Sequence, residues 1–230
     1  MTAKPAKRSQ SARTSAAASS PAEELKVDRR RTNMRAQIEA AATELFFRHG
    51  FEATSIRMIA DACGITHGAL YSHFATKEDV LFGTIERAIA ETEQMMVEAM
   101  AQAAPDPRSQ FVAAVKAFVH FHAAHRLVSL LASSEYSSLP EPRLSQVKAW
   151  RIRIRAIFER VILAGQRSGD FKLVQSRGVP AVRLASIALG DMCIRVAEWF
   201  NPDGAISAEK MAELYAELGL RLVGAKPESE

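Results

Sequence analysis

The sequence holds few cysteines and no long apolar run. The chain of 230 residues has only two cysteines, Cys63 and Cys193, far apart in sequence. Two separated thiols do not make the disulfide framework of a small secreted domain or a zinc cluster. No apolar run approaches the ~18 residues of a membrane span, and the first twenty residues lack the apolar centre of a secretory signal. We therefore expect a cytoplasmic protein with reduced, buried cysteines.

The sequence also lacks the alternation of polar and apolar residues that marks β-strands. With 48% hydrophobic residues it can still build a sizeable core. Apolar residues recur at three- and four-residue steps, between breaks at proline, glycine and serine, which predicts an all-α fold. The expected helices cover about 32–49, 54–63, 66–73, 76–103, 108–124, 126–138, 141–167, 179–200 and 207–223.

The usual marks of catalysis are missing as well. No Ser-His-Asp order, glycine-rich phosphate loop or paired carboxylates emerge, so we expect no enzyme, catalytic residue or cofactor. Histidines at 120, 122 and 125 raise the question of a metal site, but no cysteine or carboxylate lies nearby at ligand spacing, and we expect no metal. An internal cavity for an apolar ligand is one role for the aromatic and histidine side chains here, and simple core packing is the other. The candidates are Phe118, Phe121, His122, His125 and Tyr136.

The positive charge is concentrated at the amino end. The net charge is +4, yet residues 1–35 hold nine lysines and arginines against three acids. This asymmetry indicates a polyanionic partner, and a solvated tail is the alternative. Residues 1–28 have almost no bulky apolar side chains, so we expect a disordered basic arm there.

Two short helical patterns meet at the sequence CGIT, residues 63–66. Gly64 ends the first pattern and Thr66 offers a helix N-cap for the second, an arrangement typical of a helix-turn-helix. Ile65, Leu70 and Phe74 are expected to face inward. The second helix is too short to be mainly a packing element, and its remaining polar surface suits the reading of DNA.

Each outward residue of this second helix has a predicted contact. His67 can donate to a base acceptor, and Gly68 permits close approach to the duplex. Thr66 places a hydroxyl near phosphate, and Tyr71 can bond a phosphate or pack on a thymine methyl group. Lys77, at the start of the next helix, supplies a cation for the DNA backbone.

The stretch Gly50 to Leu81, GFEATSIRMIADACGITHGALYSHFATKEDVL, resembles the N-terminal domain of the TetR family of bacterial transcriptional regulators. The resemblance implies a three-helix DNA-binding domain at 29–78, followed by a helical effector-binding and dimerisation domain at 79–226. It also implies that His67 contacts bases, although that position is often Lys, Arg or Pro in the family. The residues implied to hold phosphates are Ser55, Arg57, Thr66, Tyr71, His73 and Lys77.

The carboxyl-terminal segments 179–200 and 207–223 carry apolar residues on more than one stripe. This pattern predicts pairing with a second copy in a four-helix interface, and burial within one monomer is the alternative. Residues 195–224 are similar to the ends of TetR-type repressors that control sterol and fatty-acid breakdown and respond to acyl-CoA thioesters. That similarity implies a hydrophobic effector, with an acyl-CoA as one candidate.

The sequence WRIRIR, residues 150–155, bears on the effector. Its arginines, 151, 153 and 155, suit CoA phosphates, with Trp150 stacked on a ring. The favoured interpretation is that Ile152, Ile154 and neighbouring apolar residues pack while the arginines coat a solvated face.

Together these patterns predict a homodimeric repressor of a palindromic double-stranded operator that a small hydrophobic effector releases. The alternative is a non-specific architectural DNA-binding protein driven by the basic arm. The two differ in whether binding depends on DNA sequence.

Overall fold

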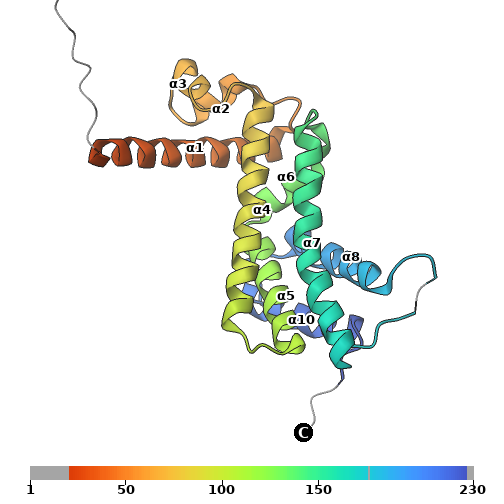
Figure 1. The fold of residues 1–230 in the computed structure, drawn as a ribbon. Coiled ribbons are helices and arrows are strands. Elements are labelled where there is room, and N and C mark those ends of the chain that lie inside the picture. Colours follow the sequence, from red (N-terminus) through yellow and green to blue (C-terminus); the bar gives the residue numbers. More distant parts are fainter. Residues whose placement is uncertain (1–20, 176, 227–230) are drawn as a thin grey trace, which may run out of the picture.

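The computed structural model describes residues 21–175 and 177–226, and over these residues the chain is helical. Figure 1 shows two long helices, α4 and α7, standing side by side, with α1 crossing α4 and with α2 and α3 at one end. The helices are α1 (Pro21–His49), α2 (Ile56–Ala62), α3 (His67–Tyr71), α4 (Lys77–Gln102), α5 (Pro107–Ala124), α6 (Arg126–Ser134), α7 (Arg143–Ser168), α8 (Ala181–Ile194), α9 (Val196–Trp199) and α10 (Ala208–Leu222).

The all-α prediction is confirmed. Among the described residues the β-structure is one isolated bridge, between Phe171 and Ala225, and there is no strand. A 3-10 turn at Tyr136–Ser138 follows α6. No helix of the described segments is long and apolar enough to cross a membrane.

The first helix begins earlier than the sequence pattern indicates. α1 starts at Pro21, so the prediction of a disordered arm is wrong for residues 21–28, and residues 1–20 lie outside the described residues. The segment PAEELK places proline at the first helical position, where its missing N–H costs nothing, followed by good helix formers. The expectation of disorder weighed only the absence of bulky apolar residues, which limits burial but not local helix formation.

Two of the expected long helices are interrupted. The predicted helix 179–200 divides into α8 and α9, which meet at Arg195, and the predicted helix 126–138 ends at Ser134 before the 3-10 turn. The apolar periodicity runs through both junctions, because the residues on each side face the same core. Periodicity alone therefore does not reveal the breaks.

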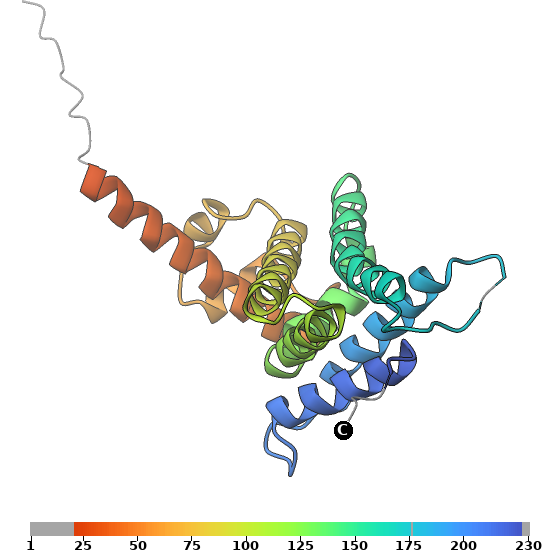
Figure 2. The ribbon, with the colours of Figure 1, turned by 60° about the horizontal axis from the view of Figure 1, so that its bottom comes forward.

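The buried residues form two clusters, which divide the chain into a head and an effector domain. The head cluster joins α1 to α4 and includes Ile38, Phe46, Ile59 and Leu70, all nearly or fully buried. The effector-domain cluster is built around α5, which packs against α4, α7 and α10. Figure 2 shows α10 lying along one side of the molecule, next to α5 and α8.

Helices α4 and α7 belong to both clusters. On α4, Val80 and Leu81 pack in the head and Met96 packs in the effector domain. On α7, Val147 is buried in the head cluster and Ile157 in the effector-domain cluster. These two helices are therefore the physical connection between the domains.

The two thiols are unpaired, as expected. Cys193 is fully buried in the effector domain and Cys63 is half-buried beside the head cluster. Burial raises the pKa of both thiols, which keeps them protonated and unreactive near neutral pH.

Candidate DNA-binding surface and effector cavity

The head presents α3 on its surface through a short turn. Gly64 adopts a φ of +65°, a left-handed conformation that favours glycine, and so reverses the chain between α2 and α3. Thr66 then caps α3, its Oγ1 accepting a hydrogen bond of 3.2 Å from the Ala69 amide. Leu70 is completely buried beneath the helix and Phe74 is nearly so, as the sequence predicted.

The outward face of α3 is open. His67 and Gly68 are exposed, and a Cβ at Gly68 would meet no atom within 4 Å. Tyr71 is 56% exposed, which is unusual for so large a ring in the absence of a partner. The structure thus brings together on one face three of the residues expected to contact DNA.

Ser55 and Arg57 flank this face at the start of α2. Ser55 caps α2 by accepting a hydrogen bond of 3.2 Å from the Met58 amide, and its own hydroxyl proton stays available for a phosphate. Arg57 makes a loose, highly exposed ion pair with Asp61 at 3.8 Å. Because such surface pairs are weak, Arg57 is free to turn towards DNA.

Lys77 is placed differently from the outward cation that the sequence suggested. Its Nζ donates to the carbonyl oxygens of Phe51 and Glu52, at 3.0 and 3.1 Å, and lies over the Phe51 ring. The side chain is only 20% exposed. Lys77 therefore fastens α4 to the loop before α2, a role that its place at the start of a helix does not reveal.

Further polar contacts hold the head together. Arg35 donates to the carbonyl oxygen of His73 at 3.0 Å, and its guanidinium lies over the Phe74 ring. The side chain of His73 is half-buried rather than outward. One turn further along the same side of α1, the buried Glu39 pairs with Arg87 of α4 at 2.7 Å, although burial raises the pKa of this carboxyl. These contacts brace α3 against α1 and α4.

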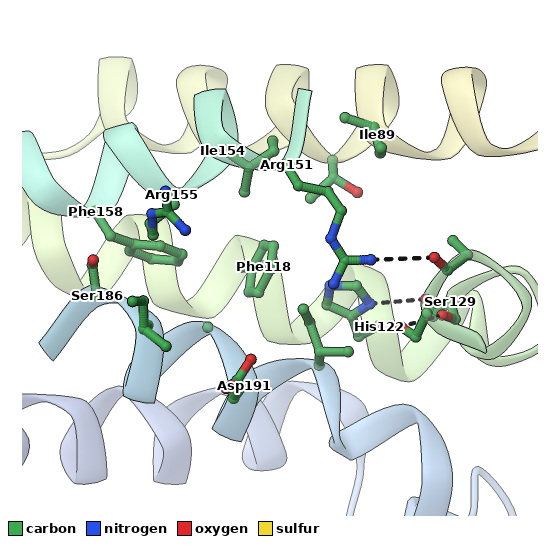
Figure 3. Close-up of a pocket in the computed structure, with 16 residues that line it drawn as sticks. Ile89, Phe118, His122, Ser129, Arg151, Ile154, Arg155, Phe158, Ser186 and Asp191 are labelled. Atoms are coloured by element: carbon green, nitrogen blue, oxygen red, sulfur yellow. Dashed lines mark hydrogen bonds between the residues drawn. The ribbon is translucent and has the colours of Figure 1, made fainter. Parts of the chain in front are cut away.

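The effector domain contains a cavity of about 170 Å³ between α4, α5, α6, α7 and α8. Figure 3 shows Phe118 and His122 of α5 facing Arg151 and Arg155 of α7 across it. Its apolar wall consists mainly of Ile89, Phe118, Ile154, Phe158, Ile187 and Ile194.

Only two of the predicted ligand residues line this cavity, Phe118 and His122. They lie four residues apart on one face of α5, with ring centroids 4.5 Å apart. Phe121 is buried one step round the helix and His125 is exposed at the junction of α5 and α6, so neither is part of the wall.

The other two candidates also lie outside the wall. Tyr136 lies beneath the Arg151 guanidinium, whose carbon is 4.7 Å from its ring centroid. Trp150 packs on Phe82 of α4, at 5.2 Å between centroids, on the side of the head. The presence of aromatic residues in a segment does not show which of them face the same neighbouring helix.

The arginines of WRIRIR divide between two environments. Arg153 forms a two-pronged pair with Glu93 on the outer surface, with contacts of 2.6 to 2.9 Å. Arg151 and Arg155 line the cavity, so the favoured interpretation of a wholly solvated arginine face is wrong for these two. Ile152 is also 54% exposed rather than packed. The four-residue spacing of Arg151 and Arg155, matched by Ile154 and Phe158, is the signal that could have placed them on the inner face.

A groove of about 530 Å³ adjoins the cavity. The two share Ser133, Arg151, Asp191 and Ile194, and the groove reaches Phe47 at the end of α1. The cavity therefore has a route towards the head. Within the described residues, no group of three or more histidines, cysteines and carboxylates could hold a metal ion.

Comparison with known proteins agrees with this arrangement of a DNA-binding head on a helical domain. A family model described as bacterial regulatory proteins, tetR family, matches residues 38–83, and one described as tetracyclin repressor-like, C-terminal domain, matches 104–223. The chain belongs to the TetR family of bacterial transcriptional regulators.

Similar proteins are found among both sequences and solved structures. The HTH-type transcriptional repressor KstR2 of Rhodococcus jostii is 27% identical over 196 residues, covering 83% of this chain and 89% of the relative. A tetR-family regulatory protein from Rhodococcus RHA1 has a TM-score of 0.75 at 28% identity, covering 84% and 98% of the two chains. AibR, solved in complex with isovaleryl coenzyme A and operator DNA, has the same fold, with a TM-score of 0.69, 20% identity and coverage of 84% and 98%.

Proposed function

We propose that this chain is a homodimeric repressor that binds a palindromic DNA operator through α3 and releases it when a small, mostly apolar effector enters the cavity. The observation that carries the proposal is the exposed face of His67, Gly68 and Tyr71 on a braced head. Leaving the large Tyr71 ring exposed to water is unfavourable and does not stabilise the fold. A protein that reads operator DNA acts in the cytoplasm of a bacterium, and we place it there.

The exposed apolar residues of α8 and α10 support the homodimer. Leu184 and Ile187 on α8, with Leu214 and Leu218 on α10, are between 36% and 46% exposed. Each pair is spaced as one helical stripe, so two copies can bury all four against each other across a two-fold axis. Two heads related by that axis would meet successive major grooves about 34 Å apart or more.

The connection between the domains supports release by an effector. Ser129, Ala132 and Ser133 of α6 line the cavity, while Leu131 of the same helix is buried in the head. Ile89 and Thr92 of α4 also line the cavity, a few residues beyond the part of α4 that packs in the head. A ligand that prefers one position of these helices would shift the head, and one that binds both positions equally would not.

The class of effector is narrowed by the relatives. KstR2 of Mycobacterium tuberculosis is described as a ketosteroid transcriptional regulator, and AibR binds isovaleryl coenzyme A. A small apolar molecule or an acyl-CoA thioester is therefore the candidate effector for this chain. The mostly apolar wall of the cavity agrees with that class.

A gel-shift with the DNA upstream of this protein's own gene tests the reading face. We expect His67→Ala and Tyr71→Ala to lose sequence-specific binding while keeping the fold, since both side chains are exposed. Arg160→Gln, an exposed change on α7, is the control and should bind as the natural protein does. Unchanged affinity in both head variants would mean that the reading surface lies elsewhere.

A cross-link tests the route of release. Fixing the two heads of a dimer at their operator-bound spacing should abolish release by effector without abolishing DNA binding. Release that survives the cross-link would contradict a change in head spacing as the mechanism.

A further inference from the structure

Arg151 is a cavity-lining cation without a carboxylate partner among the described residues. Its Nη1 donates to the Ala132 carbonyl oxygen at 3.3 Å, and its guanidinium lies over the Tyr136 ring. By contrast, Arg155 pairs with Glu159 at 3.3 Å and Arg153 pairs with Glu93. A half-buried charge next to apolar walls is costly unless an anion joins it.

His122 offers a second unsatisfied group at the same end of the cavity. Its Nδ1 lies 2.8 Å from Ser129 Oγ, while Nε2 is buried without a hydrogen-bond partner. Figure 3 shows the Arg151 guanidinium next to the His122 ring. When Ser129 donates to Nδ1, Nε2 carries the proton and becomes a hydrogen-bond donor in the cavity.

The rest of the cavity fixes the size and polarity of what it can hold. Its volume of about 170 Å³ is close to the ~150 Å³ of an engineered apolar cavity that binds benzene. Phe118, Ile154 and Phe158 supply apolar contacts away from Arg151. The space therefore suits one ring or a short branched chain.

The surroundings of the cavity disfavour a polyphosphate tail. The groove that adjoins the cavity is lined by Glu135, Asp191 and Glu198 against Arg151 and Arg195. Arg195 is already paired with Glu198. Asp191 makes no ion pair with Arg151 or Arg155 in the part of the chain that the structure describes, so it adds negative charge at the exit. The phosphates of a CoA tail leaving through this groove would meet net repulsion.

We propose that the cavity binds a compact organic monocarboxylate, with its carboxylate held by Arg151 and the Nε2 proton of His122 and its hydrocarbon part between Phe118, Ile154 and Phe158. This deepens the proposed function by naming the chemical class of the effector at the same site. Arg151 is then the residue that distinguishes the free acid from neutral molecules of the same shape.

Calorimetric titration of the full-length protein tests the class of ligand. The probes are cyclohexanecarboxylate, its carboxamide and its CoA thioester, which share one ring. We expect the acid to bind at least tenfold more tightly than either of the others, because a charge-assisted hydrogen bond is lost in both. Equal binding of the carboxamide, tighter binding of the thioester, or no binding of the acid would each overturn the proposal.

Variants of α7 test the residue. Arg151→Gln should weaken binding of the acid by about 10- to 100-fold and leave the weak binding of the carboxamide unchanged. Arg151→Lys keeps the charge and should retain part of the preference for the acid. Arg160→Gln, on the same helix but exposed and outside the cavity wall, is the matched control and should bind like the natural protein. An unaltered preference for the acid in Arg151→Gln would overturn the assignment, and if that variant does not fold, the comparison of acid and carboxamide on the natural protein still decides.

The titration does not depend on DNA, so the two proposals can fail separately. Binding of the acid by a protein that ignores every duplex would contradict the repressor and keep the carboxylate site. Specific DNA binding that is released by the thioester or by a neutral ligand, but not by the acid, would support the repressor and contradict the carboxylate site.

Discussion

The head and the effector domain use polar residues in opposite ways. In the head, the polar side chains of α3 lie on the outside, and the arginines and lysine beneath them serve to hold the short helices in place. In the effector domain, the outside of α8 and α10 carries apolar residues, and polar groups such as His122 and Arg151 line an internal cavity. Under the proposed function, the difference teaches where each domain would meet its partner: the head would meet a charged polymer at its surface, and the effector domain would meet a small molecule inside.

Removing the support beneath α3 should have the largest effect. Leu70→Ala deletes a completely buried side chain and should lower the free energy of unfolding by about 2–5 kcal/mol. Because the loss falls on the head, DNA binding should disappear while the cavity keeps its ligand affinity. Urea unfolding and ligand titration measure the two effects. The exposed change Ser72→Ala is the control, and equal loss of ligand binding in Leu70→Ala would show that the domains do not behave separately.

Low pH should lower the stability of the effector domain through its buried histidine, His122. Burial, with smaller contributions from Arg151 and His125, lowers the pKa of His122 from 6.5 to about 3. Above pH 6.5 this imidazole is neutral in both the folded and the unfolded chain. Between pH 6.5 and 3 only the unfolded chain takes up the proton, so stability falls as the pH falls.

The size of this effect follows from the shift. At ~1.4 kcal/mol for each pH unit, the His122 contribution amounts to about 3 kcal/mol between pH 6 and pH 4. Urea unfolding at several pH values gives the free energy of unfolding of the natural protein and of His122→Gln. The His122 contribution is the difference between the two slopes of this free energy against pH. Parallel curves for the two proteins would contradict a neutral, buried His122.

Single changes on the reading face should act on DNA binding alone. His67→Ala and Tyr71→Ala should each weaken operator binding by about 1–3 kcal/mol, with no change in the free energy of unfolding beyond ~0.5 kcal/mol. The loss in His67→Ala should concentrate at one operator position. Competition between duplexes with single base changes measures it, and a uniform loss at all positions would assign His67 to the DNA backbone instead.

The smallest expected effect is on the cap of α3. Thr66→Ala removes the hydroxyl that accepts from the Ala69 amide and should cost about 1 kcal/mol of stability. Thr66→Ser keeps the hydroxyl and is the control. Thermal unfolding compares them, and equal loss in both variants would mean that the methyl group, not the cap, matters.

The sequence predicted the head better than the effector domain. Capping residues and a glycine at a helix end are local signals, and they correctly placed the turn at Gly64, the N-cap at Thr66 and the inward side of Leu70. The contacts of Lys77 were not predicted, because its partners are two carbonyl groups some 25 residues earlier, which a local pattern does not reveal.

The cavity depends on contacts between distant segments. Arg151 and Arg155 face His122 and Ser129 only because α7 packs across α5, with Arg151 reaching Ala132 of α6. The spacing within α7 indicates which of its residues share a face, but not what that face meets. Of the residues that the sequence proposed for a cavity, Phe118 and His122 line this one, because they share a face of one helix. The sequence misplaced Tyr136 and Trp150, whose neighbours come from other helices.

The most direct test of the account is the preference of the protein for one DNA sequence. A duplex selected from random DNA by the full-length protein should bind, near physiological salt, at least ~10³-fold more tightly than the same duplex scrambled, and Tyr71→Ala should remove most of this ratio. Equal affinity for both duplexes, together with a steep dependence on salt, would contradict sequence reading by α3 and favour a non-specific DNA-binding protein.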